Sequence, residues 1–239
     1  MLPLEVSTFA SRLQSVESRI EDALKRAGRQ RSEITLVAVS KKFSADRIRE
    51  AYAAGLREFG ENYVQEFADK QPELSDLKNA RFHLIGHLQA NKARLGAELF
   101  DVVQTADSAK LLTRLDAAVA AKRGHLEILL EIKLSDEQSK SGASPDDIPA
   151  LLESAHACQH LKLTGLMTMP PWSEDTEKSR PYFRKLAVLA AQYSLPKLSM
   201  GMSNDFEVAI EEGATILRVG TALFGARPKP QKSSVSSPS

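Results

Sequence analysis

Ile34-Thr-Leu-Val-Ala-Val-Ser-Lys-Lys42 is an apolar, β-branched stretch that ends in two lysines. A run that is apolar on both faces is typical of a strand buried on both sides, as in parallel sheets covered by helices. In such folds the carboxyl ends of the strands carry the ligand sites. The two lysines therefore mark a candidate site at the end of a buried strand.

Side chains alternate along a strand, so Lys41 should share a face with Val37 and Val39, and Lys42 should point to the opposite face. One lysine can then enter the interior of a barrel or cleft. A desolvated lysine has a lowered pKa, and its neutral amine can form a Schiff base with an aldehyde. The strand could equally end in solvent, where charged side chains usually lie.

The composition is that of an ordinary globular protein, with 42% hydrophobic and 26% charged residues among 239. A net charge of +1 gives no general reason to expect nucleic acid or anionic membrane as a partner. The segment after Met1 lacks a signal-like core, and no apolar run could span a bilayer. The single cysteine, Cys158, cannot form an internal disulfide. We therefore expect a cytoplasmic protein.

Strand-like and helix-like segments alternate along the chain. Apolar residues at helical spacing over 7–26 predict an amphipathic N-terminal helix that is stopped by Gly28. Eight strand-like segments follow, at 34–42, 57–62, 81–86, 99–104, 126–133, 161–167, 197–200 and 214–219. The helix-like segments between them cover about 44–55, 63–70, 91–99, 108–122, 145–156, 175–193 and 204–212.

This alternation predicts an α/β fold, a single closed (β/α)₈ TIM barrel with an extra N-terminal helix. The barrel domain should occupy residues 1–226, and the Ser/Pro-rich segment 227–239 should be a disordered tail. An open doubly wound sheet is the alternative, but no Gly-x-Gly-x-x-Gly follows the first strand.

Two segments near the C-terminus predict an anion site. Ser199-Met-Gly-Met-Ser-Asn-Asp205 is a glycine-containing turn that opens a helix, and Ser203 adds a hydroxyl to its backbone amides. In Arg218-Val-Gly-Thr-Ala-Leu-Phe-Gly225, Gly220 allows close backbone approach and Thr221 adds a second hydroxyl. The loops after strands 7 and 8 of a barrel often bind phosphate. Both segments could instead be plain turns with N-cap residues.

Other polar residues also follow strands. Arg218 could face the barrel interior, and Asn62 could bind a ligand or merely cap the next helix. His83 and His87 have the spacing of a helical metal pair, but they stand on a strand and its loop without an adjacent glutamate, so we expect no metal site. The chain has no nucleophile elbow, P-loop or paired-cysteine motif.

Five segments together resemble the YggS/PROSC family, the pyridoxal phosphate homeostasis proteins. They are Val37-Ala-Val-Ser-Lys41, Phe59-Gly-Glu-Asn-Tyr-Val-Gln-Glu66, His83-Leu-Ile-Gly-His-Leu-Gln-Ala-Asn-Lys92 and the two C-terminal segments above, 199–205 and 218–225. The resemblance covers essentially the whole chain except the tail. It implies the barrel of the alanine racemase N-terminal domain, the type III fold for pyridoxal 5'-phosphate.

The resemblance also implies roles for seven residues in binding this cofactor. Lys41 would hold the cofactor aldehyde as an internal aldimine, and Ser203, Gly220 and Thr221 would bind the phosphate. Arg218 would lie near the pyridine nitrogen, with Asn62 and Met200 along the ring. No residue is expected to be catalytic.

An arginine beside the pyridine nitrogen bears on catalysis. A guanidinium cannot accept a proton at neutral pH, so the ring nitrogen should stay neutral and the cofactor should be a weaker electron sink. Racemases that share this barrel also use an arginine there, but they carry a second β domain and a tyrosine base from a partner subunit. Here the barrel uses the chain up to about Gly225.

The sequence and the resemblance therefore predict a carrier or buffer of pyridoxal phosphate without robust turnover. We expect a monomer, with pyridoxal phosphate-dependent apoenzymes as candidate recipients. One alternative is an amino-acid racemase, whose second acid/base could only be His83 or Tyr63 among the motif residues. The other is a barrel enzyme that forms a Schiff base between Lys41 and a phosphorylated metabolite.

Overall fold

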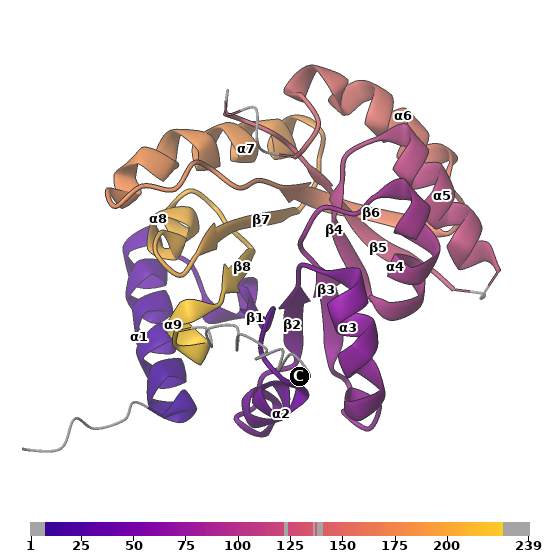
Figure 1. Cartoon of the computed structure of the whole chain (residues 1–239). Helices are drawn as coiled ribbons and strands as arrows, with labels where there is room; N and C mark the ends of the chain where they lie inside the picture. The colour runs from indigo at the N-terminus through magenta and orange to yellow at the C-terminus, as the bar shows by residue number, and fades with distance from the viewer. Residues whose placement is uncertain (1–7, 122–123, 136, 138–140, 227–239) are drawn as a thin grey trace, which may run out of the picture.

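Eight parallel strands form a closed barrel in chain order, and β8 pairs with β1. The structure is a computed structural model that describes residues 8–226 except 122–123, 136 and 138–140 (Figure 1). The strands are β1 (Thr35–Val39), β2 (Glu58–Glu61), β3 (Arg81–Leu84), β4 (Val102–Ala106), β5 (Leu126–Glu131), β6 (Leu161–Met167), β7 (Lys197–Met202) and β8 (Ile216–Val219). The predicted (β/α)₈ barrel is confirmed, while the predicted tail, 227–239, lies outside the described residues.

Helices surround the strands on the outside of the barrel (Figure 1). They are α1 (Phe9–Ala27), α2 (Ala45–Ala53), α3 (Val64–Lys70), α4 (Ala93–Leu99), α5 (Ala109–Ala120), α6 (Ile148–Ala157), α7 (Arg180–Gln192), α8 (Phe206–Glu211) and α9 (Thr221–Phe224). Short 3₁₀ helices cover Arg31–Glu33, Gln71–Leu74, Ala90–Lys92, Pro145–Asp147 and Thr176–Ser179. The one-turn helix α9 stands where the sequence predicted only a loop. Within the described residues, none of the helices is long and apolar enough to cross a membrane.

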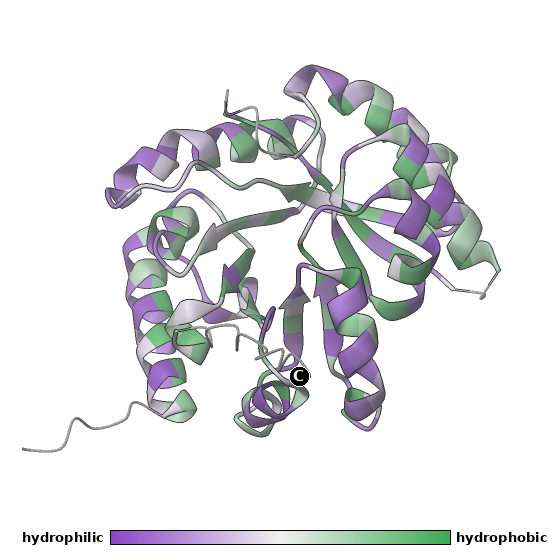
Figure 2. Ribbon diagram, in the orientation of Figure 1, coloured by the Kyte–Doolittle hydropathy of each residue, from purple (hydrophilic) through white to green (hydrophobic). Residues whose placement is uncertain are grey.

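The barrel strands are buried on both faces, as the apolar run at 34–42 predicted. Most of the core lies between the strands and the helices, and Figure 2 shows the apolar colour concentrated there. A smaller cluster fills the barrel interior, formed by Val37, Val102, Leu129, Met167 and Ile216. Val37 belongs to this inner cluster and Ala38 to the outer core, so the predicted alternation along β1 is confirmed.

The N-terminal helix α1 packs beside α8 and α9, and its buried residues recur at helical spacing. It ends at Gly28, whose φ of 66° is left-handed, as its place after the apolar stripe predicted. Arg12 Nε donates to the carbonyl of Leu223 in α9 at 2.6 Å, and Arg19 Nε contacts Glu207 in α8 at 2.6 Å. The extra helix therefore braces the two elements that follow β7 and β8.

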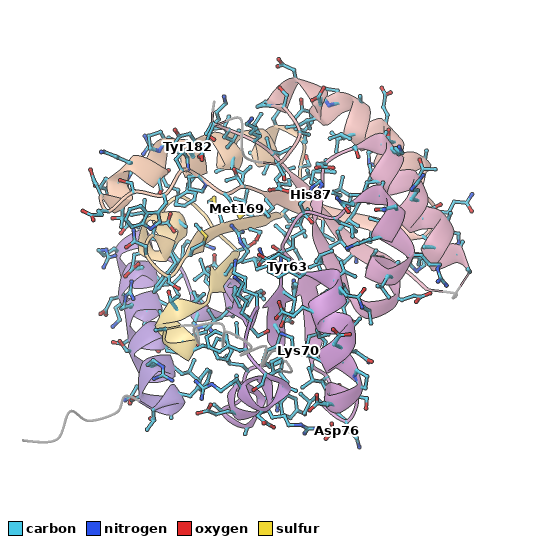
Figure 3. The ribbon with its side chains drawn as sticks, viewed as in Figure 1. Tyr63, Lys70, Asp76, His87, Met169 and Tyr182 are labelled. Carbon is cyan, nitrogen blue, oxygen red and sulfur yellow. The ribbon has the colours of Figure 1, made fainter. Side chains whose placement is uncertain are left out.

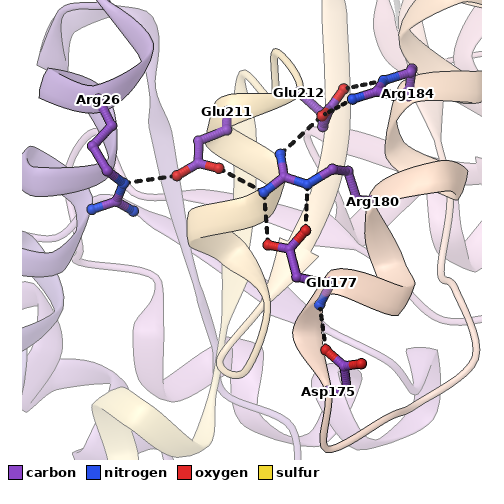
Figure 4. A network of polar contacts seen from close by, with 7 residues as sticks. All are labelled: Arg26, Asp175, Glu177, Arg180, Arg184, Glu211 and Glu212. Atoms are coloured by element: carbon purple, nitrogen blue, oxygen red, sulfur yellow. Dashed lines mark hydrogen bonds and ion pairs between the residues drawn. The ribbon is translucent and has the colours of Figure 1, made fainter.

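An ion-pair network joins α7 to α8 and α1 (Figure 4). Arg180 contacts Glu177, Glu211 and Glu212, each at 2.9 Å or less. Glu211 also contacts Arg26 of α1 at 2.8 Å. Single exposed ion pairs contribute little, but a network in which one guanidinium serves three carboxylates holds its members in a fixed arrangement. The segment after β7 is thus held from both sides.

Candidate functional site

A cavity of about 300 Å³ lies at the carboxyl ends of the strands, where barrels carry their ligand sites. Its lining residues are Val39, Lys41, Asn62, Ile85, Met169, Trp172, Ser173, Met202, Ser203, Asn204, Asp205, Arg218, Gly220 and Thr221. The structure thus brings together six of the seven residues predicted from the sequence. The seventh, Met200, does not line this cavity.

Lys41 stands two residues after the end of β1, is half-buried and lines the cavity. Lys42 is exposed, and its φ of 65° is left-handed, so the backbone turns between the two lysines. The expectation that only one lysine of the pair enters the barrel end is confirmed.

Helix α3 fixes the backbone around the two lysines. Lys70 Nζ donates to the carbonyls of Ser40 at 3.4 Å and Phe43 at 3.0 Å, and it is only 8% exposed (Figure 3). The Lys42 amide donates to Glu66 Oε1 at 2.6 Å. Together these bonds hold the carbonyls and amide on both sides of Lys41, which limits where its amine can lie.

The same buried lysine has a carboxylate partner at the end of β2. Glu61 is fully buried, and its Oε1 accepts hydrogen bonds from Lys70 Nζ and Ser40 Oγ, both at 2.8 Å. Burial raises the pKa of Glu61, and the charge and hydrogen bond of Lys70 oppose that rise. The Lys70–Glu61 pair therefore links β1, β2 and α3 below the backbone turn at Lys41 and Lys42.

Asn62 lines the cavity and carries an unpaired acceptor that is itself shielded from solvent. Its Oδ1 is buried and has no hydrogen-bond partner among the described residues. The N-cap position of α3 belongs to Tyr63, so the reading of Asn62 as the helix cap is wrong. Gly86 permits this arrangement, because a Cβ there would lie 2.2 Å from the Asn62 carbonyl oxygen. A ligand donor or a bound water would satisfy the orphaned oxygen.

The loops after β7 and β8 meet at Ser203. Its Oγ accepts hydrogen bonds from the backbone amides of Gly220 at 3.1 Å and Ala222 at 3.3 Å. Thr221 lies between these two amides and also lines the cavity. Arg19 of α1 donates to the Ser203 carbonyl at 3.4 Å. The two amides are therefore engaged by Ser203 Oγ, and the hydroxyls of Ser203 and Thr221 stand beside backbone amides at the cavity, an arrangement typical of phosphate sites.

Met200 is fully buried in the outer core, and Met202 lines the cavity instead. Ser199 points inward, where it contacts Arg218, so its neighbour Met200 points outward. The pairing of β7 with β8 shifts register between Ser199 and Met202, and Gly201 there has a φ of 90°. This irregularity, which simple alternation could not reveal, turns Met202 toward the site.

Arg218 is buried, and both terminal nitrogens of its guanidinium are engaged. Nη1 donates to Ser199 Oγ at 2.6 Å and Nη2 to the Thr168 carbonyl at 2.9 Å. Burial lowers its pKa to about 10, while Asp205 and Glu131 oppose the change. The group stays cationic at neutral pH and can only donate hydrogen bonds, as the sequence predicted.

The two residues considered as a second acid/base do not reach the cavity. His83 is buried, with its ring nitrogens 2.5 Å from Glu58 and 2.8 Å from Gln104. Tyr63 is half-exposed and lines a neighbouring depression (Figure 3). Asp205 does line the cavity, but its carboxylate accepts bonds from Ser179 Oγ and the Met202 amide, both at 2.8 Å.

Apolar side chains complete the cavity wall, and sequence reasoning missed most of them. Ile85, Met169 and Trp172 follow β3 and β6, and Trp172 is 72% exposed at the rim. Met200 was the only apolar side chain among the residues predicted for the site. The site combines an apolar wall, an amine, a cationic donor and two loops that present hydroxyls and backbone amides. This set fits a phosphorylated aromatic aldehyde.

Comparison with known proteins places the chain in a family. Residues 12–228 match the family model described as "Alanine racemase, N-terminal domain". The "Pyridoxal phosphate homeostasis protein" of Pseudomonas aeruginosa is 45% identical over 93% of this chain and 97% of its own length. The protein of the same description in Escherichia coli K12 is 41% identical over 93% of this chain and 98% of its own length.

Solved structures agree with the sequence comparison. PipY of Synechococcus elongatus, solved without and with pyridoxal phosphate bound, superposes with TM-scores of 0.83 and 0.81 at 39% identity, over 91% of this chain and all of PipY. Alanine racemase of Corynebacterium glutamicum shares the fold, with a TM-score of 0.64 at 17% identity over 92% of this chain and 63% of the racemase. The chain therefore belongs to the alanine racemase N-terminal domain family and, within it, to the pyridoxal phosphate homeostasis proteins.

Proposed function

We propose that this protein binds pyridoxal 5'-phosphate and serves in its homeostasis as a carrier or buffer without robust turnover. The observation that carries the proposal is that Lys41, Arg218 and the Ser203–Gly220 pair line one cavity. A relative solved with pyridoxal phosphate bound, at 39% identity, supports the same ligand.

Each group of the cavity has a distinct part in the proposal. The Lys41 amine attaches the cofactor covalently, and the loops after β7 and β8 bind its phosphate through Ser203, Gly220 and Thr221. Arg218 lies at the pyridine nitrogen as a donor-only partner, so it supplies no proton acceptor there. Asn62, which lines the cavity, lies along the ring. Met202 takes the place along the ring that the sequence had given to Met200.

The bound cofactor would supply an electron sink for reactions at an amino acid's α-carbon. Racemisation needs a second acid/base opposite the lysine, and among the residues that the structure describes the titratable groups lining the cavity are Lys41, Asp205 and Arg218. Asp205 is committed to two hydrogen bonds, and Arg218 stays protonated. This arrangement favours storage and delivery of the cofactor over turnover.

The remaining parts of the proposal concern the protein's setting. We infer a monomer in the cytoplasm that passes its cofactor to pyridoxal phosphate-dependent apoenzymes. A racemase is the alternative function. A barrel enzyme that acts on a phosphorylated metabolite is a weaker alternative, because the Lys41 amine would then bind a substrate and not the cofactor.

Two assays on one preparation test the proposal. The loaded protein is mixed with an apo-aminotransferase, and recovery of aminotransferase activity is measured against the same concentration of free cofactor. In parallel, L-alanine is incubated with the loaded protein and D-alanine is measured. We expect transfer without racemisation above the free-cofactor rate, and Lys41→Ala should release its cofactor on gel filtration. Racemisation well above that rate would show an enzyme instead.

A further inference from the structure

A line of hydrogen-bonded side chains crosses the barrel interior and ends on Arg218. Arg218 Nη1 lies 2.6 Å from Ser199 Oγ, which lies 2.5 Å from Gln104 Oε1. Gln104 Nε2 lies 2.8 Å from His83 Nδ1, and His83 Nε2 lies 2.5 Å from Glu58 Oε2. The four residues from His83 to Arg218 are each at most 3% exposed. They come from β3, β4, β7 and β8 and connect one barrel end with the cavity at the other.

The charge of Arg218 sets the direction of every bond in this line. A guanidinium can only donate, so Ser199 Oγ accepts a hydrogen bond from it and donates its own O–H to Gln104 Oε1. The amide of Gln104 then presents its NH₂ group to His83, whose Nδ1 must be an unprotonated acceptor. His83 therefore carries its proton on Nε2 and donates it to the Glu58 carboxylate.

We propose that His83, Gln104 and Ser199 are positioning residues that hold the Arg218 guanidinium in its place beside the cavity. The proposal rests on the proposed function for the identity of the ligand, but the direction of the line is a property of the protein alone. In this arrangement Ser199, Gln104 and His83 each accept one hydrogen bond and donate one along the line, so every one of the atoms facing a neighbour in the line is satisfied. Turning the guanidinium would leave the Ser199 acceptor and the Thr168 carbonyl without their donor.

Charged groups lie at both ends of the line. At the far end, Glu58 also faces Arg81 at 3.5 Å. At the cavity end, Glu131 and Asp205 act on Arg218 through their charges. Between these ends, the members are an imidazole, an amide and a hydroxyl. The Gln104→Glu substitution should disturb this line, because it replaces the NH₂ donor that faces His83 Nδ1 with a carboxylate oxygen, which is an acceptor.

The first test needs no cofactor. Histidine is labelled with ¹⁵N, and the ring signals of His83 are assigned by comparison with His83→Asn among the five histidines. Wild type should show a neutral ring with its proton on Nε2 at neutral pH. In Gln104→Glu a carboxylate oxygen faces Nδ1, so His83 should become doubly protonated in the same pH range. A wild-type proton on Nδ1, or an unchanged ring in Gln104→Glu, would overturn the proposal.

The second test follows the ligand by titration with pyridoxal phosphate and by its visible absorption band. Ser199→Ala removes the acceptor of Arg218 Nη1, and we expect binding roughly tenfold weaker with a shifted band. Ser199→Thr keeps the hydroxyl and should restore wild-type values. Thr164→Val is the matched control, because it also removes a buried hydroxyl but lies outside the line, bonded to Glu127 at 2.9 Å. Urea denaturation confirms that each variant is folded.

The outcomes separate this proposal from the proposed function. If wild type binds the cofactor and Ser199→Ala matches it in affinity and band position, the positioning role is wrong and the function stands. If wild type fails to bind pyridoxal phosphate at all, the proposed function is wrong. The His83 ring signals then decide the positioning line independently of any ligand.

Discussion

The hydroxyl of Ser203, after β7, accepts a hydrogen bond from the backbone amide of Gly220, after β8, at 3.1 Å. This bond joins the two loops that in barrels of this type often bind phosphate. Arg19 and Arg12 of α1 brace the same two loops from the outside, through the Ser203 and Leu223 carbonyls. The extra N-terminal helix thereby acts as a support for the anion site.

Ser203→Ala should weaken binding of pyridoxal phosphate roughly tenfold, because a hydrogen bond to a charged group contributes about 1.5–3 kcal/mol. Binding of pyridoxal, which lacks the phosphate, should hardly change. Ser173→Ala is the matched control, since Ser173 lines the same cavity but contacts the Asp175 amide. Affinities of both ligands are measured by spectroscopic titration. Equal losses for the two ligands would place Ser203 away from the phosphate.

Trp172 is the single tryptophan of the chain and stands at the cavity rim. Its emission should fall as pyridoxal phosphate binds, because the cofactor absorbs light in the region where tryptophan emits. The Trp172→Phe variant serves as the emission blank. Its affinity for pyridoxal phosphate, measured by absorbance, should stay within about threefold of wild type, because the Trp172 side chain is largely exposed. Constant emission during saturation, with binding seen by absorbance, would place the ligand elsewhere.

Much of this architecture could be predicted from the sequence. The buried run at 34–42, its terminal lysines and the eightfold alternation predicted the barrel, and the glycine-containing segments predicted that the loops after strands 7 and 8 share one site. The family resemblance implied that Met200 lies along the cofactor ring, but Met200 lies in the outer core, and the register shift near Gly201, which depends on pairing between β7 and β8, turns Met202 to the cavity instead. The line from Glu58 to Arg218 was also missed. Its members are far apart in sequence, and only barrel closure brings them together.

Lys70→Met should destabilise the protein by about 3 kcal/mol, because it leaves the buried Glu61 carboxylate without its cation. Glu61→Leu alone should also be destabilising, whereas the double variant should lose less than the sum of the two. Urea denaturation gives each free energy of unfolding, with the exposed Lys185→Met as control. Additive losses would mean that the two residues do not stabilise each other.

Glu131 should make stability depend on pH. Burial raises its pKa from 4.5 to about 7, assisted by Asp107 and opposed by Arg218. Between pH 4.5 and about 7, the folded protein therefore keeps a proton on Glu131 that the unfolded chain has already released. This stabilising contribution is complete below pH 4.5 and is lost as pH rises through 7, with a cost of at most about 3 kcal/mol at pH 8.

Glu131→Gln should therefore be more stable than wild type at pH 8 and gain little at pH 4.5, as judged by urea denaturation at the two pH values. Glu153→Gln, on the exposed face of α6, should show no such difference. An advantage of Glu131→Gln that is the same at both pH values would show that Glu131 does not titrate in this range.

The most direct test of the central claim is to load the protein with pyridoxal phosphate, reduce it with borohydride and map the modified peptide by mass spectrometry. The lysine pair provides the internal control, because Lys41 lines the cavity and Lys42 is exposed. We predict that the reduced cofactor is found on Lys41, that Lys42→Ala leaves this labelling intact and that Lys41→Ala abolishes it. Labelling of Lys42 in place of Lys41, or no specific labelling, would contradict the account.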